Sequence, residues 1–247
     1  MSAPLINFSV LEPALSAQRT ANGWCVALSG GVDSCVLLRL LCDWREQDDS
    51  LPPLRAIHVN HNMQAAAAQF ALACEALCAA LAVPFDVVEV EVAAHRDGPE
   101  AAARAQRYAA LAAQVRPGEL LLTAHHLDDQ VETVLLRLLR GAGARGLAGI
   151  PTQRTLPDSD VAVMRPLLDV TREQIRQYAQ SRGLAYVEDP SNCDLTLDRN
   201  YLRLQVLPLL EARWPGYRGT ISRAAQNLGP VLRLLSWGQS YPLVSHH

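Results

Sequence analysis

A short glycine turn between an apolar run and an amphipathic segment constrains the fold more than any other feature of the chain. Residues 24–28 are typical of a buried strand, and residues 35–41 have the periodicity of a helix. The hexapeptide SGGVDS, residues 29–34, joins them. Two glycines let backbone N–H groups curl around an anion, and the helix N-terminus adds partial positive charge. The sequence therefore predicts a phosphate site at a strand-to-helix junction.

Asp33 refines this prediction, because a carboxylate repels a bare phosphate. A divalent cation between the carboxylate and the phosphate would remove this repulsion. The hydroxyls of Ser29 and Ser34 can also donate hydrogen bonds to the phosphate. The chain contains no lysine, so all 22 basic residues are arginine. This excludes the lysine-dependent GxxxxGK[ST] phosphate loop. The competing interpretation is an ordinary strand-to-helix turn capped by Asp or Ser.

Strand and helix patterns alternate from residue 23 onward. Expected strands cover 24–28, 54–60, 84–92, 119–123 and a short stretch ending at Met164; expected helices cover 34–46, 65–82, 99–114, 128–140, 171–182, 197–211 and 219–236. This alternation predicts an α/β fold with an open, mostly parallel sheet, helices on both faces and a small helical region after it. Residues 1–215 are expected to form the main domain and 216–247 a helical extension. Ser29, Asn60 and His125 follow or end strands, so they should converge at the carboxyl edge of the sheet.

A second polar constellation lies where the strand at 119–123 passes into a helix. It contains two adjacent histidines and three carboxylates: His125, His126, Asp128, Asp129 and Glu132. Asp129 and Glu132 lie three residues apart and Asp128 and Glu132 four apart, so they share one helical side. Carboxylates in a first helical turn also gain from the helix dipole, which is the purely structural interpretation. The cluster exceeds what capping requires and suits metal binding, positioning of an amine, or proton transfer.

Composition narrows the class of protein. The chain is 49% hydrophobic and 19% charged, which is typical of globular proteins. The net charge of −3 is uneven: residues 1–136 carry 8 arginines and 16 acids, whereas residues 137–247 carry 14 arginines and 9 acids. The basic half favours either nucleic-acid contact or a solvated arginine surface. The six cysteines form no CxxC pair and are interpreted as reduced core residues. Without a signal peptide or a bilayer-length apolar run, a cytoplasmic enzyme is expected.

Several motifs, in order over about residues 20–215, resemble the tRNA(Ile)-lysidine synthetases, which belong to the PP-loop ATP pyrophosphatases. They are SGGVDS at 29–34, HVNH at 58–61, EAAARAQRY at 100–108, AHHLDDQVET at 124–133, LLRGAGARGLAGI at 138–150, RPLL at 165–168 and EDPSNCDLTLDRNYLR at 188–203. The resemblance implies a ligase that forms a carbon–nitrogen bond. ATP adenylates the C2 oxygen of the wobble cytidine in the CAU anticodon of tRNA(Ile) and releases pyrophosphate. L-Lysine then attacks C2, expels AMP and leaves lysidine.

The resemblance also implies site residues, with ATP and Mg²⁺ as cofactors, tRNA(Ile) and L-lysine as partners, no membrane, and a homodimer as a candidate assembly. The implied catalytic residues are Asp33, His125, Asp128, Asp129, Glu132 and Arg104; the ATP-binding residues are Ser29, Gly30, Gly31, Val32, Asp33, Ser34, His58 and Asn60. The implied metal ligands are Asp33 and Asp129. The implied tRNA-binding residues are Arg165, Arg199, Asn200 and Arg203. Asp129, Glu132 and His125 all stay open as the group that holds and deprotonates the lysine amine. Arg104 is expected to clamp the lysine carboxylate or the AMP phosphate.

Two departures and two alternatives accompany this interpretation. Asn62, Met63 and Gln64 follow HVNH where the family usually has a short Leu-Arg, which loosens any role assigned to that loop. The family also continues into a C-terminal region that helps to hold the tRNA, so the chain is expected to be either truncated or a compact variant. A purely structural role competes with the tRNA role of Arg199, Asn200 and Arg203: a helix capped and paired with the nearby Asp194 and Asp198. The alternative functions are another PP-loop tRNA-modifying reaction, such as thiolation, or a non-catalytic nucleotide- or RNA-binding module.

Overall fold

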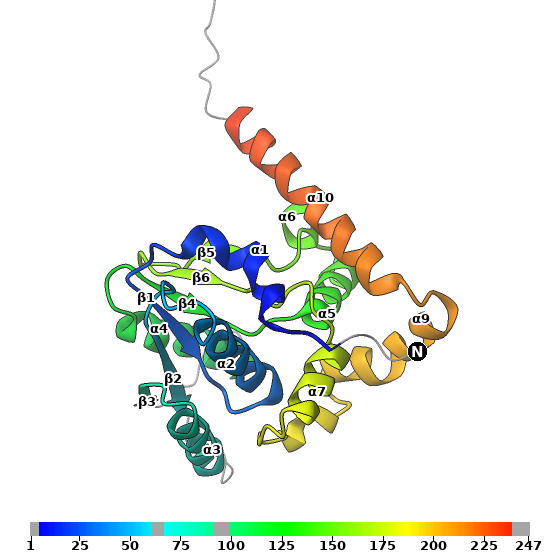
Figure 1. The fold of residues 1–247 in the computed structure, drawn as a ribbon. Helices are drawn as coiled ribbons and strands as arrows, with labels where there is room; N and C mark the ends of the chain where they lie inside the picture. Colours follow the sequence, from blue (N-terminus) through cyan, green and yellow to red (C-terminus); the bar gives the residue numbers. More distant parts are fainter. Residues whose placement is uncertain (1–4, 61–66, 91–98, 239–247) are drawn as a thin grey trace, which may run out of the picture. The chain divides into compact units, whose positions relative to one another are not determined.

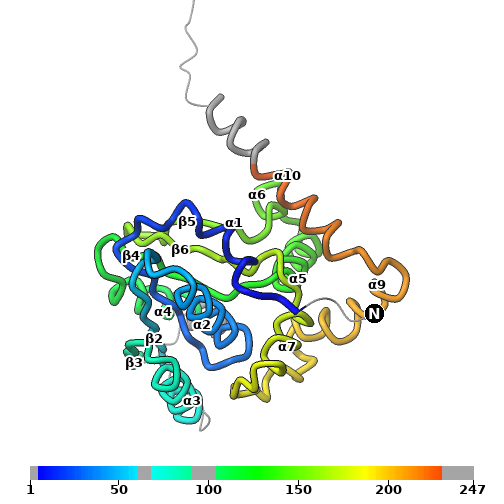
Figure 2. Tube along the Cα trace, viewed as in Figure 1, coloured from blue at the N-terminus to red at the C-terminus, as the bar shows by residue number. Residues whose placement is uncertain are grey.

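The chain folds into two compact units, each assembled from two separate stretches of sequence. The computed structural model describes residues 5–60, 67–90 and 99–238. One unit contains Met1–His126 and Thr152–Asp189; the other contains Leu127–Pro151 and Pro190–His247. We call them the sheet unit and the helical unit. The ribbon in Figure 1 and the trace in Figure 2 show the chain leaving the sheet unit after strand β4 and re-entering it at β5. The expected domain boundary at residue 215 stays a prediction.

The sheet unit is built on one six-stranded sheet. Its strands are β1 (Gly23–Ala27), β2 (Leu54–Asn60), β3 (Phe85–Glu89), β4 (Glu119–Leu122), β5 (Gln153–Thr155) and β6 (Ala162–Met164). Their spatial order is β3-β2-β1-β4-β6-β5, and every neighbouring pair is parallel except β5 with β6. The mostly parallel sheet is therefore confirmed. The antiparallel edge strand β5 was not expected, because three residues are too few to show a periodicity.

Helices cover both faces of this sheet, as expected. They are α2 (Val32–Arg45), α3 (Ala67–Ala80), α4 (Pro99–Gln114) and α7 (Arg172–Ser181), preceded by the short helices η1 (Phe8–Leu11), α1 (Glu12–Leu15) and η2 (Ser16–Gln18). One core joins the sheet to α2, α3 and α7 through residues such as Leu37, Cys74 and Ile175. The other core lies on the opposite face, where Leu111 of α4 packs with Cys25 and Ile57.

Local signals account for where α7 begins and ends. Thr171 caps the helix: its hydroxyl accepts from the amide of Gln174 at 3.2 Å, and the Gln174 side chain accepts from the Thr171 amide at 2.9 Å. Gly183, with φ of +60°, follows the end of the helix. This capping box and glycine stop are the ones that the sequence predicts.

The amino edge of the sheet contains a buried, fully compensated arginine. The Arg55 side chain on β2 donates to both carboxylate oxygens of Glu119 at 2.9 and 2.6 Å, to Asp86 at 3.1 Å and to the carbonyl of Gln114 at 2.7 Å. Hydrogen bonding to Glu119 raises the pKa of Arg55 despite its burial. The cluster fastens β2, β3, β4 and the end of α4 together.

The helical unit contains α5 (Leu127–Leu139), α6 (Ala144–Leu147), η3 (Pro190–Cys193), α8 (Asp198–Tyr201), the π-helical turn η4 (Leu202–Val206), α9 (Leu207–Arg213) and α10 (Tyr217–Gly238). Val131, Leu202, Leu207 and Tyr217 form its core. The single helix expected at 197–211 is instead three successive pieces. Pro208 has no N–H for the regular helical ladder, so a wider turn precedes it. Among the described residues, no helix is long and apolar enough to cross a membrane.

Candidate functional site

The glycine turn after β1 has a conformation that demands glycine at one position. Gly30 has φ of +84°, and a Cβ there would lie 3.1 Å from Phe70 Cδ1 and 3.2 Å from Cys74 Sγ on α3. Gly31 is different, because its φ is −77° and the nearest atom to a Cβ would be Ser29 Oγ at 3.6 Å. The backbone conformation and the close approach of α3 therefore both require glycine at position 30.

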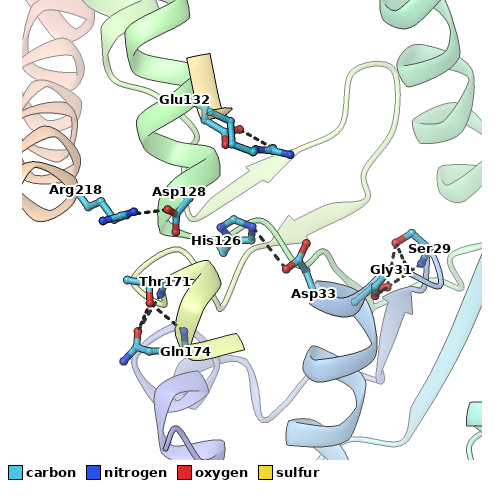
Figure 3. A network of polar contacts seen from close by, with 11 residues as sticks. Ser29, Gly31, Asp33, His126, Asp128, Glu132, Thr171, Gln174 and Arg218 are labelled. Carbon is cyan, nitrogen blue, oxygen red and sulfur yellow. Dashed lines mark hydrogen bonds and ion pairs between the residues drawn. The ribbon is translucent and has the colours of Figure 1, made fainter. Parts of the chain in front are cut away.

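Two serines hold this loop in shape. Ser34 Oγ donates to the carbonyl of Gly31 at 3.0 Å and accepts from the amide of Ser29 at 3.1 Å, and the two serine hydroxyls are 3.0 Å apart (Figure 3). The amide of Val187 donates to the carbonyl of Gly30 at 3.0 Å. A hydroxyl network therefore pre-shapes the loop at the start of α2, where helical amides lack intrahelical acceptors. This geometry suits a phosphate.

Asp33 lies in the first turn of α2 and faces a histidine. Its Oδ1 is 3.6 Å from Nε2 of His126, whose side chain is fully buried, while the Asp33 side chain keeps about a third of its surface exposed, at 34% (Figure 3). The carboxylate therefore has one side toward the protein and one toward solvent. Such a group can bind a cation on its exposed side while the imidazole orients it.

His58 contacts the backbone immediately before the glycine loop. Its Nδ1 is 2.8 Å from the carbonyl of Leu28, the residue before Ser29, and 3.6 Å from the Cys74 thiol. Burial lowers the pKa of His58, and Arg107 lowers it further, whereas the bond to Leu28 opposes them. A neutral imidazole donating through Nδ1–H fits this contact. The prediction that His58 binds ATP stays untested, and the contact that the structure shows is with the loop backbone.

The strand topology brings the three strand-end residues to the carboxyl edge of the sheet, as expected. Ser29 follows β1, Asn60 ends β2 and His125 follows β4, and these strands are adjacent and parallel. Asn60 is buried, and Thr123 Oγ1 lies 3.1 Å from Nδ1 of His125. Val32 is the first residue of α2.

In the helical unit, late arginines pair with the carboxylates on α5. Glu132 is fully buried and accepts two hydrogen bonds from Arg203, at 2.7 and 2.9 Å, with Arg199 Nε at 3.4 Å. Arg218 donates to Asp128 at 2.8 Å (Figure 3). Asp129 lies half-buried in the same first turn. The charge of Glu132 is thus already compensated by two of the arginines predicted to bind tRNA.

Asn200 is also engaged within the helical unit. It is buried, and its side-chain amide donates to the carbonyls of Ser191 and Asp194 at 2.8 and 2.9 Å. Of the pairing expected with Asp194 and Asp198, the structure shows the bond from Asn200 to the Asp194 carbonyl, whereas Arg199 and Arg203 contact Glu132 and Asp198 pairs with Arg140. Their tRNA-binding role stays a prediction.

A group of arginines surrounds Tyr108 of α4. The guanidinium carbons of Arg104 and Arg154 lie 5.2 and 5.1 Å from the centre of its ring. Arg165, which follows β6, is only 2% exposed and interacts with the Tyr108 hydroxyl. A side chain this deeply buried is poorly placed for the predicted contact with tRNA.

His126 belongs to the histidine pair of the predicted polar cluster, but the sequence assigned it no role of its own. Three further site-forming residues were not predicted: Arg154, Tyr108 and Arg218. Arg154 lies on the unexpected strand β5. Arg218 is 90 residues from Asp128, and no local pattern connects them.

A metal site made of protein side chains alone is not evident within the described ranges. There, no group of three or more His, Cys, Asp or Glu side chains is close enough to hold a metal ion. Asp33 still fits a magnesium ion, because Mg²⁺ commonly binds one or two carboxylates together with substrate phosphates and waters.

Comparisons with known proteins agree with this geometry. The chain is 48% identical over 215 residues to the tRNA(Ile)-lysidine synthase of Pseudomonas putida and 47% identical over 228 residues to that of Pseudomonas aeruginosa. These alignments cover 87% and 92% of this chain but 49% and 51% of the relatives, so the chain spans about half the length of the curated relatives that it matches.

Among solved structures, the U34-tRNA thiolase NcsA from Methanococcus maripaludis, a structure with its [4Fe-4S] cluster, is similar in fold. The TM-score is 0.74 at 21% identity, over 90% of this chain and 77% of that one. An NMN synthetase from Francisella tularensis gives a TM-score of 0.50 at 11% identity, over 88% and 93%. Finally, the PP-loop domain family profile matches residues 7–210, which contain the loop, both strand-end histidine segments and the arginine group around Tyr108. The chain therefore belongs to the PP-loop domain family.

Proposed function

We propose that this chain carries out the ATP-dependent ligation of L-lysine to C2 of the wobble cytidine in the CAU anticodon of tRNA(Ile), with release of AMP and pyrophosphate. The observation that carries the proposal is 47–48% identity, over 215–228 residues, to relatives named tRNA(Ile)-lysidine synthase. Because the chain spans about half of those relatives, the activity, the tRNA and lysine are all part of the proposal. The cytoplasm, where these substrates meet, is the proposed compartment.

The loop after β1 supports the first half of this reaction. In the proposal, the amides at the start of α2 and the hydroxyls of Ser29 and Ser34 hold the pyrophosphate portion of ATP. Asp33 would hold Mg²⁺, which neutralises charge on the phosphates as the leaving group departs. His126 keeps the Asp33 carboxylate oriented toward that position. C2 of cytosine becomes a usable electrophile only once its oxygen is a good leaving group.

The second half requires a neutral lysine amine, because the free ammonium group is protonated near neutral pH. Three groups were open as its acceptor. We now assign Glu132 a positioning role, because its carboxylate is buried and bonded to Arg203 and Arg199. Asp129 and His125 stay as candidates for holding the ammonium and accepting its proton.

Thiolation is the alternative to be weighed, because a similar fold serves a tRNA thiolase. That likeness concerns the fold alone. Burial raises the pKa of Cys35 and of Cys78 to about 12 each, and that of Cys42 to about 11. Such thiols rarely become the thiolates that sulfur transfer or iron–sulfur ligation needs. The environment of these buried thiols therefore supports lysine ligation over thiolation.

The test is transfer of labelled L-lysine to tRNA(Ile) bearing CAU by the 247-residue chain, with ATP and Mg²⁺. Asp33→Asn should abolish transfer, because it removes the proposed metal ligand at nearly constant size. Asp49→Asn is the matched control, since Asp49 is an exposed aspartate of the same unit. Pyrophosphate release is measured in the same reactions.

The outcomes separate the parts of the proposal. Transfer that Asp33→Asn removes and Asp49→Asn retains supports it. Pyrophosphate release without lysine transfer would retain ATP activation and reject lysine as the acceptor for this chain. Absence of both with every tRNA tested would favour the non-catalytic binding module.

A further inference from the structure

The direction of one peptide in the glycine loop decides which backbone group the loop can offer to an anion. Gly30 and Gly31 are joined by a trans peptide, so the carbonyl of Gly30 and the N–H of Gly31 point in opposite directions. The Ser29 Oγ that accepts from this N–H lies 3.4 Å away, beyond the usual limit of about 3.2 Å. The Gly31 N–H is therefore held weakly within the loop, and a bound anion can take it over.

Two adjacent glycines make this peptide easy to reverse. A reversal rotates ψ of Gly30 and φ of Gly31 by about half a turn, because these are the two soft dihedral angles that flank the planar peptide. The φ of Gly31 would then pass from −77° into the positive region, which glycine adopts readily and other residues do not. An interaction from outside the two glycines is therefore needed to select one direction.

Val187 supplies such an interaction. Its amide donates to the carbonyl of Gly30 at 3.0 Å, which turns the Gly31 N–H away from the segment that follows α7. Val187 is half-buried and lies in an irregular stretch between α7 and η3, so its N–H is not used in a helix or a strand ladder. We call residues 184–187 the strap.

Side-chain contacts fasten the strap to α2, the helix that begins directly after the loop. Asp43, in the last turn of α2, is buried and accepts hydrogen bonds from the Tyr178 hydroxyl at 2.5 Å and from Arg182 at 2.8 Å. Leu184 and Tyr186 of the strap pack against the core that α2 and α7 share. The strap and the loop are therefore both held by α2, one near each end of that helix.

We propose that the strap is a positioning element that aims the Gly31 N–H at the phosphate bound by the loop, with the Val187 amide as the positioning donor. The phosphate then gains a charge-assisted hydrogen bond without the cost of ordering a reversible peptide. This inference rests on the proposed function for the substrate that carries the phosphate. The direction of the peptide itself depends only on contacts within the sheet unit.

Binding of pyrophosphate and of ATP to the 247-residue chain, with Mg²⁺ and without tRNA, tests the strap. Val187→Pro removes the donating N–H, whereas the control Val187→Ala retains it and shortens the side chain. We expect Val187→Pro to weaken binding about tenfold, as for one charge-assisted hydrogen bond, and Val187→Ala to leave it nearly unchanged. Should Val187→Pro fail to fold in thermal unfolding, replacement of Val187 by α-hydroxyisovaleric acid exchanges only the N–H for an ester oxygen.

A second substitution separates peptide direction from a general disturbance of the fold. Alanine at position 31 accepts φ of −77° but disfavours the reversed peptide, and its Cβ meets nothing closer than 3.6 Å. We therefore expect Gly31→Ala to restore most of the binding that Val187→Pro loses, although alone it changes binding little. A loss caused by damage to the fold would not be restored in this way.

The outcomes decide between these explanations. The strap is rejected if Val187→Pro binds as the wild type does, if Val187→Ala loses as much as Val187→Pro, or if Gly31→Ala restores none of the loss. It is also rejected if neither pyrophosphate nor ATP binds the wild-type chain. Because tRNA and lysine are absent from the assay, failure of lysine transfer alone would reject the proposed function and leave the strap standing.

Discussion

Arginine and carboxylate side chains occur at both edges of the sheet unit, but their surroundings differ between the two edges. At the amino edge, Arg55 and Glu119 satisfy each other, and their contacts tie three strands to the end of α4. At the carboxyl edge, Gly30 has a positive φ, Asp33 keeps about a third of its side-chain surface exposed beside the buried His126, and burial lowers the pKa of Arg165. One edge therefore uses its charges to fasten strands together, whereas the other presents a carboxylate that is partly open to solvent.

Glu119→Gln should give the largest effect on stability. It leaves the buried Arg55 with only the half-exposed Asp86 as a carboxylate partner, so we expect the free energy of unfolding to fall by about 3 kcal/mol or more. Urea unfolding measures this change. Activity per folded molecule should stay constant. The double variant Arg55→Gln/Glu119→Gln should lose less than the sum of the single losses, and strict additivity would contradict the coupling.

Gly30→Ala and Gly31→Ala form a matched pair at the carboxyl edge. The first places a Cβ in the left-handed region and against α3, so we expect ATP-dependent turnover to fall about 100-fold as the loop is displaced. The second meets nothing closer than 3.6 Å and should retain most activity. Pyrophosphate release reports both. Equal losses in the two variants would show that steric room at Gly30 is not the reason.

His58 should give the sheet unit a pH-dependent stability. Its folded pKa lies below the ordinary 6.5, so the unfolded chain binds the extra proton more readily and stability falls as pH drops below about 6.5. His58→Gln retains an N–H donor for Leu28 but does not titrate. We expect its stability to decline less steeply below pH 6.5 than that of the wild type. Superimposable pH profiles of the unfolding midpoint would refute this role.

Asp86→Asn should have the smallest effect. The Asp86 side chain is 54% exposed, and such ion pairs contribute less than about 1 kcal/mol. Urea unfolding of this variant beside Glu119→Gln separates the buried partner of Arg55 from the exposed one. A loss as large as that of Glu119→Gln would mean that the cluster acts as one network.

Ion pairs within the helical unit account for part of the uneven charge of the chain. The interpretations of the basic half as a whole directed its arginines outward, to nucleic acid or to solvent, and the pairing expected for the late arginines was with Asp194 and Asp198. Arg199, Arg203 and Arg218 instead meet the carboxylates of α5, where Glu132 is fully buried. Net charge along a sequence does not reveal such pairing, because the partners are 67 to 90 residues apart.

Local chemistry in the sequence determined much of this protein. Apolar runs of strand length, the capping box at Thr171 and the SGGVDS turn each depend on neighbours within a few residues, so the parallel sheet and the loop were predictable. The order of the strands placed Ser29, Asn60 and His125 at one edge. The PP-loop family assignment followed from the same motifs.

Tertiary structure alone decided which of the predicted polar residues face one another. It placed His126 against Asp33, bonded His58 to the loop backbone, and gathered Arg154 and Arg165 around Tyr108 through an edge strand of three residues. These contacts join segments that are distant in the chain. Side-chain direction there depends on strand register and helix packing, which no short sequence window encodes.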